Sequence, residues 1–215
     1  MTVTDEFLAN NARYAQAFSG PLPAPPSAHV AVVACMDARL NVYALLGLNE
    51  GEAHVIRNGG GVITDDAIRS LAISQRLLGT REIVLIHHTE CGMLGFTDDQ
   101  FKRSIQDETG IKPPWAAESF TDLDEDVRQS IARILASPFV PHKDAIRGFV
   151  FDVATGKLSE VSLARRTPEG EAALSRTVAG CFGVIPRGGR RLRRYPARWQ
   201  TASTLLPSGS RTKAP

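Results

Sequence analysis

The stretch VAVVACMDARL (residues 30–40) places five small or β-branched apolar residues directly before a cysteine, an aspartate and an arginine at alternate positions. A short, continuous apolar run of this kind is typical of a strand buried on both faces of a parallel sheet. Because alternate residues of an extended segment point to the same side, we expect Cys35, Asp37 and Arg39 to share one face. The stretch therefore predicts a central strand whose end carries chemically active groups.

The segments around this strand repeat an order of strand, loop and helix. We predict strands over 29–34, 53–57 and 82–87, and helices over 3–18, 64–78, 98–108 and 122–136. Residues 147–161 alternate around a Thr-Gly pair, which predicts a strand, a turn and an edge strand. This order predicts an α/β fold with a mostly parallel central β-sheet flanked by helices and an edge strand pair at the C-terminal end of the domain.

The bulk composition indicates a globular protein. The 215 residues are 43% apolar, which is enough to bury a substantial core. The chain has no apolar run of about 18 residues that could span a membrane, and its N-terminus does not resemble a signal peptide, so we expect a cytoplasmic protein. Cys35, Cys91 and Cys181 are too few for a disulfide framework, which leaves reduced thiols as ligands or nucleophiles.

The charge changes sign along the chain. Residues 1–160 hold 14 Lys and Arg against 21 Asp and Glu, whereas residues 161–215 hold 11 against 2. We predict a domain over 1–160 and a basic, flexible C-terminal extension over 161–215. The Arg-rich segment 187–198, with Tyr195 and the adjoining Trp199, could contact nucleic acid or an anionic surface. The composition favours a solvated extension or the product of an aberrant reading frame.

A second group of candidate ligands, His88 and Cys91, follows the strand predicted over 82–87. The carboxyl ends of neighbouring parallel strands face a common crevice, so these side chains can meet Cys35 there. Two cysteines and one histidine indicate a zinc site with a fourth position open to water or substrate. Two alternatives remain: each residue could be an ordinary core residue, or Cys91 could be a nucleophile with His88 as its base.

The pair Asp37 and Arg39 also has two interpretations. It could be a plain surface ion pair, which contributes little to stability. Beside an open metal site, however, a carboxylate held by an arginine stays ionised and can accept a hydrogen bond from the nucleophile. The loop Asn58-Gly59-Gly60-Gly61 follows the strand predicted over 53–57, and its glycines allow unusual backbone angles and close approach to a ligand.

Four motifs, in this order and spacing, resemble the β-class carbonic anhydrases, particularly their small bacterial and archaeal branch: ACMDARL, HVIRNGGG, TDDAIRSLAISQRLLGTREI and IHHTECGM. The resemblance extends from about residue 3 to about residue 160. It implies that one zinc ion per chain is bound by Cys35, His88 and Cys91, and that Asp37 and Arg39 form the dyad beside the fourth coordination site. Cys181 is not expected to be a ligand.

The family has two forms of this site. In the open form the fourth position holds water or hydroxide, and in the closed form the aspartate itself binds zinc and its pair with arginine is broken. The resemblance also implies a homodimer or higher homo-oligomer, with the N-terminal helix reaching across to the partner. The chain departs from the family at Gly59, because members commonly have Asn-Ala-Gly in this loop.

The resemblance implies reversible hydration of carbon dioxide to bicarbonate and a proton by zinc-bound hydroxide. We expect the small substrate pocket to be lined by Asn58, Gly59, Gly60 and Val62, with Leu94 as a further candidate. His54 and His87 are candidate proton carriers, although a structural role is the simpler expectation for each. The alternatives are hydrolysis of carbon disulfide or carbonyl sulfide at the same site, and a non-catalytic zinc- or anion-binding regulator that acts through the basic extension.

Overall fold

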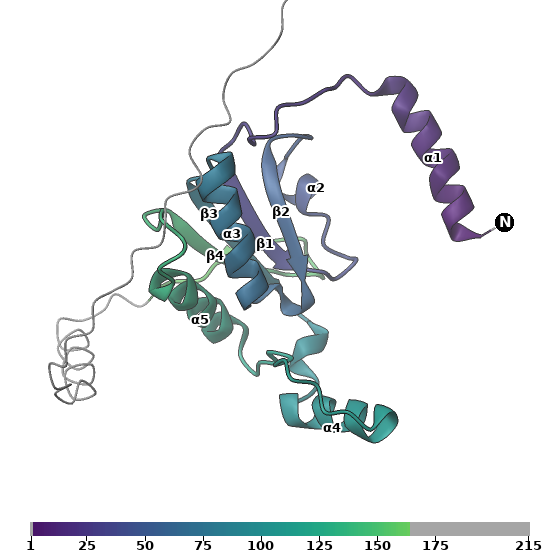
Figure 1. The fold of residues 1–215 in the computed structure, drawn as a ribbon. Helices are drawn as coiled ribbons and strands as arrows, with labels where there is room; N and C mark the ends of the chain where they lie inside the picture. Colours follow the sequence, from purple (N-terminus) through teal and green to yellow (C-terminus); the bar gives the residue numbers. More distant parts are fainter. Residues whose placement is uncertain (1, 164–215) are drawn as a thin grey trace, which may run out of the picture. The chain divides into compact units, whose positions relative to one another are not determined.

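The computed structural model describes residues 2–163, in which five strands form one sheet in the order β2-β1-β3-β4-β5 (Figure 1). The strands are β1 (Val30–Cys35), β2 (Ala53–Asn58), β3 (Glu82–His88), β4 (Ile146–Phe151) and β5 (Leu158–Glu160). The first four run parallel, and β5 pairs antiparallel with β4. The predicted α/β fold with its mostly parallel sheet and edge strand pair is confirmed.

The helices of this region are α1 (Val3–Ala17), α2 (Val42–Leu46), α3 (Asp65–Leu78), α4 (Asp98–Thr109) and α5 (Leu123–Ala136). Two short 3-10 helices, η1 (Gly59–Gly61) and η2 (Gly92–Leu94), follow β2 and β3. The side chain of Thr64 caps α3 at the Ala67 amide, and Gly79 ends it in the left-handed conformation, so its bounds agree with the helix predicted over 64–78. The five-residue α2 was not predicted, although Asn41 and Gly47 cap it in the usual way.

The core has two layers, one on each face of β1. Ala31 and Val33 pack with apolar residues of α3 and α5, while Val32 and Ala34 pack on the opposite face with α2 and with Phe120. All four of these β1 residues are fully buried, which explains why the strand is a continuous apolar run and does not alternate. The helices α3 and α5 cover the same face of the sheet (Figure 1).

The arrangement of strands brings the predicted metal ligands to one edge of the sheet. β1 and β3 are parallel neighbours in which Ala34 pairs with Ile86. Cys35 and His88 therefore stand at the carboxyl ends of adjacent strands. The Gly59–Gly61 turn also packs against these strands, because Gly61 approaches the backbone of Cys35. The sheet alone thus places three of the predicted motifs together.

The edge pair continues just beyond β5, where the buried Val161 donates its amide to the carbonyl of Gly148 at 2.9 Å. Of the predicted extension over 161–215, residues 164–215 lie outside the described residues, and Cys181 and the Arg-rich segment lie there too. Within the part that is described, no helix is long and apolar enough to cross a membrane.

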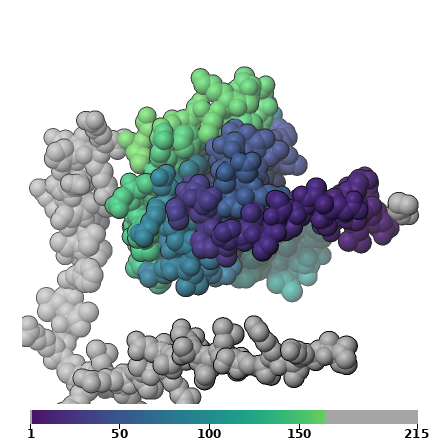
Figure 2. Space-filling view, turned by 90° about the horizontal axis from the view of Figure 1, so that it is seen from above, coloured from purple at the N-terminus to yellow at the C-terminus, as the bar shows by residue number. Residues whose placement is uncertain are grey.

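The helix α1 carries apolar residues that remain open to the surface. None of its residues is buried, and Val3, Phe7 and Leu8 are each more than 60% exposed. The space-filling view shows the N-terminal segment, in purple, on the face turned to the viewer (Figure 2). An isolated helix of this length is only marginally stable in water. Because none of its residues is buried, α1 lacks the packing that usually stabilises such a helix.

Candidate metal centre

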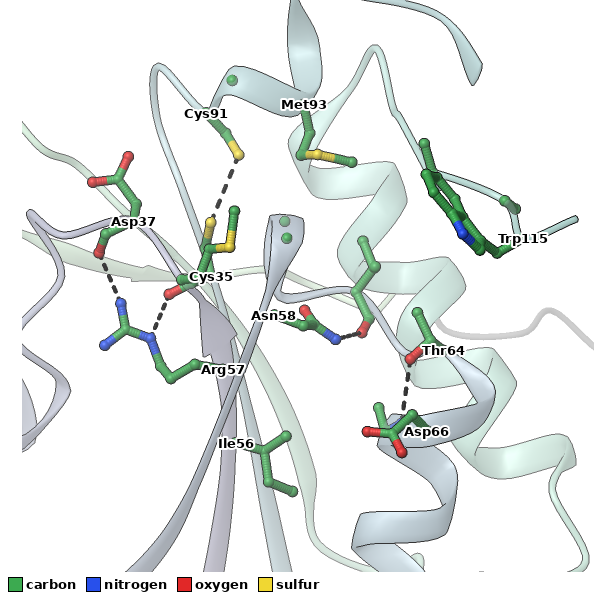
Figure 3. A pocket seen from close by; sticks show the side chains of 18 of the residues that line it. Cys35, Asp37, Ile56, Arg57, Asn58, Thr64, Asp66, Cys91, Met93 and Trp115 are labelled. Carbon is green, nitrogen blue, oxygen red and sulfur yellow. Dashed lines mark hydrogen bonds between the residues drawn. The ribbon is translucent and has the colours of Figure 1, made fainter. Parts of the chain in front are cut away.

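The three predicted metal ligands meet at the carboxyl ends of β1 and β3. The thiol sulfurs of Cys35 and Cys91 and a ring nitrogen of His88 all lie within 4.8 Å of one another. The two sulfurs are 3.9 Å apart, and Figure 3 shows them pointing toward each other. The three residues are buried, with exposed fractions of 4%, 0% and 6% for Cys35, His88 and Cys91. This donor set, two sulfurs and one imidazole, is one that zinc accepts.

The imidazole of His88 is oriented for metal binding. Its Nδ1 lies 2.8 Å from the carbonyl oxygen of Thr89, which can only accept, so Nδ1 carries the proton and donates. The other nitrogen, Nε2, is buried and has no hydrogen-bond partner among residues 2–163. A backbone carbonyl that fixes the ring and leaves one nitrogen free is the usual support of a metal-binding histidine. The residues therefore fit a bound metal ion.

The two thiols differ in acidity. The hydrogen bond from Cys91 and the nearby His88 lower the pKa of Cys35 to about 4, despite burial, which acts in the opposite direction. The same hydrogen bond, together with burial, raises the pKa of Cys91. Burial lowers the pKa of His88, but the Cys35 thiolate outweighs this effect and raises it overall. The neighbouring groups thus favour the thiolate form of Cys35, which is the form that binds a metal ion.

Asp37 and Arg39 form a tightly bonded pair next to this cluster. Arg39 donates to the Asp37 carboxylate from its backbone amide, Nε and Nη2, at 2.9, 3.0 and 2.8 Å. These hydrogen bonds hold the pKa of Asp37 far below its ordinary value. The Oδ2 of Asp37 lies 3.7 Å from Nε2 of His88. The carboxylate therefore stays ionised and faces the candidate metal ligands, unlike that of a plain surface ion pair.

Glu90 extends this network from the loop between the other two candidate ligands. Its carboxylate accepts from Nη1 of Arg39 at 3.1 Å, and its backbone carbonyl accepts from Nη2 at 3.2 Å. Glu90 has a φ of 56°, which is uncommon for a residue other than glycine. The sequence does not predict this contact, because nothing in the pattern around Glu90 links it to Arg39.

A cavity of about 700 Å³ opens beside the cluster. The residues predicted to form the pocket all line it: Asn58, Gly59, Gly60 and Val62. Leu94 does not line it, and its neighbour Met93 does. The remaining wall is mainly apolar and includes Met36, Phe96, Phe101 and Trp115, of which Figure 3 labels Trp115. The aromatic residues were not predicted, since they belong to α4 and to loops without a recognisable motif.

The glycine loop and its neighbours hold the cavity wall in place. Asn58 donates from Nδ2 to the carbonyl of Val62 at 2.8 Å, which closes the turn. Gly60 and Gly61 have φ values of 82° and 74°, a region that favours glycine. Arg57, which the sequence analysis also did not single out, donates to backbone carbonyls of the Cys35–Leu40 segment.

The two histidines considered as proton carriers occupy structural positions. The Nδ1 of His54 lies 2.8 Å from the hydroxyl of Ser74, and Nε2 of the fully buried His87 lies 2.6 Å from the carboxylate of Asp126. Neither residue lines the cavity beside the candidate metal ligands. The geometry thus supports the simpler, structural expectation for both.

Comparison with known proteins agrees with this fold and site. A family model described as "Carbonic anhydrase" matches residues 30–158, more than half of the chain, and the chain belongs to that family. Its relatives place it in the β class. It is 71% identical over 162 residues to "Beta-carbonic anhydrase 1" of Mycobacterium tuberculosis, a match that covers 75% of this chain and 99% of the relative.

More distant relatives and a solved structure extend the comparison. The chain is 35% identical over 155 residues to "Carbon disulfide hydrolase" of Acidithiobacillus thiooxidans, covering 62% of this chain and 77% of that protein. The crystal structure of carbonic anhydrase from Streptococcus mutans superposes with a TM-score of 0.70 at 43% identity, covering 75% of this chain and 99% of the other. The β-class fold predicted from the motifs is therefore confirmed.

Proposed function

We propose that this protein catalyses the reversible hydration of carbon dioxide to bicarbonate and a proton. The observation that carries the proposal is the buried cluster of Cys35, His88 and Cys91 with the ionised Asp37 carboxylate 3.7 Å from the free nitrogen of His88. Membership of the carbonic anhydrase family and the 71% identical relative named as a β-carbonic anhydrase support it.

Cys35, His88 and Cys91 would hold one zinc ion per chain. A zinc ion with three protein ligands acts as a Lewis acid that lowers the pKa of a bound water to about 7, which supplies hydroxide as the nucleophile. The supporting observations are the thiolate character of Cys35 and the free, buried Nε2 of His88. The three side chains also need little rearrangement, because their donor atoms already lie within 4.8 Å of one another.

Asp37 would orient the nucleophile. Its Oδ1 accepts two hydrogen bonds from Arg39 and its Oδ2 accepts one, so Oδ2 keeps a lone pair for a further donor. Because Oδ2 is also the oxygen nearest to His88 Nε2, it can accept a hydrogen bond from the nucleophile and so orient the nucleophile's remaining lone pairs. The arginine keeps the carboxylate in its accepting, ionised state throughout the neutral pH range.

The cavity suits an uncharged, linear substrate. Apolar side chains such as Val62, Met93 and Trp115 supply much of its wall, and they offer a molecule like carbon dioxide no competing hydrogen bonds. The intact pair of Asp37 and Arg39 supports the open form of the family, in which the aspartate does not bind the metal. The described geometry therefore favours a form that is ready for catalysis.

A homodimer or higher homo-oligomer belongs to the same proposal. The exposed apolar residues of α1, including Phe7 and Leu8, support it, since a partner subunit would supply the packing that the helix lacks. A cytoplasmic location is proposed as well, because the free thiols of Cys35 and Cys91 are suited to a reducing compartment.

Hydrolysis of carbon disulfide is the second candidate, favoured by the 35% identical relative that carries this name. Both candidates use the same ligands, so a direct comparison separates them: stopped-flow hydration of carbon dioxide against sulfide release from carbon disulfide, on the same zinc-loaded protein. We expect rapid hydration and little sulfide. Release of sulfide without hydration of carbon dioxide would show that carbon disulfide is the substrate and would refute the proposed one.

The remaining alternative is a non-catalytic regulator that acts through the basic extension. It predicts that removal of residues 161–215 abolishes function and that Asp37→Asn has no effect. The proposed enzyme predicts the opposite for carbon dioxide hydration. A chain ending after Leu163, which keeps the buried Val161, is the better truncation because it leaves the core intact.

A further inference from the structure

Arg57 connects the sheet to the segment that carries the candidate catalytic groups. It lies on β2, where it pairs with Ala34 of the neighbouring β1. Its guanidinium donates from Nε to the carbonyl of Cys35 at 2.5 Å, from Nη2 to that of Asp37 at 2.7 Å and from Nη1 to that of Leu40 at 3.1 Å. Figure 3 shows the first two of these hydrogen bonds.

These contacts begin at the carboxyl end of β1, where the backbone hydrogen bonds of the sheet end. The amide of Met36 donates to the carbonyl of Asn58 at 2.7 Å, and beyond it the segment leaves β1. A turn follows in which the amide of Leu40 donates to the carbonyl of Asp37 at 3.1 Å. Arg57 contacts the carbonyl of the last residue of β1 and the carbonyls of the first and last residues of this turn, so its planar group spans the whole segment.

The charged guanidinium of Arg57 donates hydrogen bonds to these carbonyls and forms no ion pair with a described carboxylate. Within residues 2–163, no ion pair involves Arg57. A guanidinium presents five donors in a rigid fork, and hydrogen bonds from a charged donor are stronger than neutral ones. A lysine carries the same charge on a single nitrogen, which lacks this fixed geometry.

The pair of Asp37 and Arg39 needs such an external support. The two residues are separated by one position, so their hydrogen bonds hold them to each other and allow them to move as a unit. Their position relative to His88 depends on contacts with other elements. Glu90 provides two, one from its 70% exposed side chain and one from its backbone carbonyl, and both reach only the side chain of Arg39. Arg57 provides three, and all of them are to the backbone of the segment itself.

We propose that Arg57 is a positioning residue that fixes the Cys35–Leu40 backbone and thereby holds the Asp37 carboxylate in place beside the metal ligands. The inference rests on the proposed function as far as activity is concerned. The structural part of the inference, that one guanidinium holds this backbone segment in place, can be tested by hydrogen exchange independently of catalysis.

The test compares zinc-loaded wild type with Arg57→Lys and Arg57→Ala. Arg76→Lys and Arg76→Ala are matched controls, since Arg76 is also exposed and donates to a backbone carbonyl, that of Phe139, at 2.8 Å, but does not line the cavity beside the ligands. Zinc content, kcat and KM for hydration, and hydrogen exchange of the amides in residues 36–40 are measured for each protein.

We expect both Arg57 variants to retain zinc and to lose kcat by at least about tenfold, with KM changed far less, because misplacement of a catalytic group mainly affects the chemical step. Hydrogen exchange of the backbone amides in residues 36–40 should become at least about tenfold faster in both variants than in wild type. Added guanidinium should restore part of the activity of Arg57→Ala, and the Arg76 controls should match wild type.

Two results would overturn the inference: unchanged exchange in residues 36–40 of Arg57→Lys, or a loss of kcat that merely follows a loss of zinc. The lysine variant keeps the charge and the aliphatic stem, so the test does not depend on the alanine variant being folded. Absence of hydration activity in wild type would refute the proposed function, while the exchange measurement would still decide the role of Arg57.

Discussion

Gly61 is the residue at which the backbone of the site tolerates a side chain least. Its φ is 74°, and a Cβ added there would lie 2.7 Å from the amide nitrogen of Cys35 and 3.0 Å from both the carbonyl carbon of Ala34 and the carbonyl oxygen of Ile86. These are backbone atoms of the two central strands, and Ala34 and Ile86 are fully buried. They cannot give way without distorting the sheet next to a candidate metal ligand.

The cost of Gly61→Ala follows from these contacts. The left-handed conformation costs an alanine about 1–2 kcal/mol, and overpacking a rigid core site costs about 1–3 kcal/mol, which together give about 2–5 kcal/mol. A domain of ordinary stability has about 5–15 kcal/mol in total. The substitution should therefore lower the free energy of unfolding by a large share and weaken zinc binding through the displaced Cys35.

Gly59→Ala is the matched control, two residues away in the same turn. The nearest atom to an added Cβ is Sδ of Met93 at 3.8 Å, an ordinary contact, and the φ of Gly59 lies outside the left-handed region. An alanine at such a position stabilises a protein by about 0.4–1 kcal/mol, because it restricts the unfolded chain. The family resemblance, in which alanine is common here, agrees with this expectation.

Urea-induced unfolding of zinc-free wild type and both variants, followed by circular dichroism, measures the two effects, and zinc titration measures the affinity. We expect a lower midpoint and weaker zinc binding for Gly61→Ala, and a midpoint equal to or above wild type for Gly59→Ala. A stable Gly61→Ala, or equal destabilisation by both substitutions, would refute the reasoning from backbone contacts.

Three further predictions concern the dyad, the pH dependence of stability and the N-terminal helix. Asp37→Asn should retain zinc and lose about 100-fold or more in kcat, measured by stopped flow, because misorientation of a reacting group costs about that much. Burial raises the pKa of Asp98, but hydrogen bonds from Ser119 and its neighbours outweigh it and lower the pKa overall, so Asp98→Asn should destabilise zinc-free protein in urea at pH 7 and progressively less below the ordinary value of 3.8. Replacing Phe7 and Leu8 together by serine should shift the oligomer toward monomer in analytical ultracentrifugation.

Each of these predictions has a result that would contradict it. Full hydration activity in Asp37→Asn would remove the carboxylate from the mechanism. A loss of stability in Asp98→Asn that is the same at pH 7 and at about pH 3 would show that its ionised form is not what the hydrogen bonds stabilise. An unchanged oligomer after replacement of Phe7 and Leu8 would mean that α1 does not contribute to association.

The fold was predictable because its signals are local. The continuous apolar run of β1 reflects burial on both faces, and the caps Thr64 and Gly79 mark both ends of α3. The order of elements then sets the parallel sheet, which brings Cys35 and His88 to adjacent strand ends. Among the α-helices of residues 2–163, the short α2 was missed, since five residues are too few to show a helical period.

The residues that surround the candidate ligands and support them could not be predicted in the same way. Arg57 acts through backbone carbonyls, which leave no trace in the side-chain sequence of their acceptors. Glu90 meets Arg39 across 51 residues, and Trp115 reaches the cavity from a loop without periodicity. Such contacts depend on how separate elements pack, so they emerge only from the three-dimensional structure.

The central claim is that a zinc ion at Cys35, His88 and Cys91 makes this protein a carbon dioxide hydratase. One preparation decides it when bound zinc and the hydration rate are measured together between about pH 7 and pH 9. We predict one zinc per chain and a hydration rate that falls in proportion to zinc on chelation and returns when zinc is restored. A fully zinc-loaded protein that shows no hydration across this range would contradict the account.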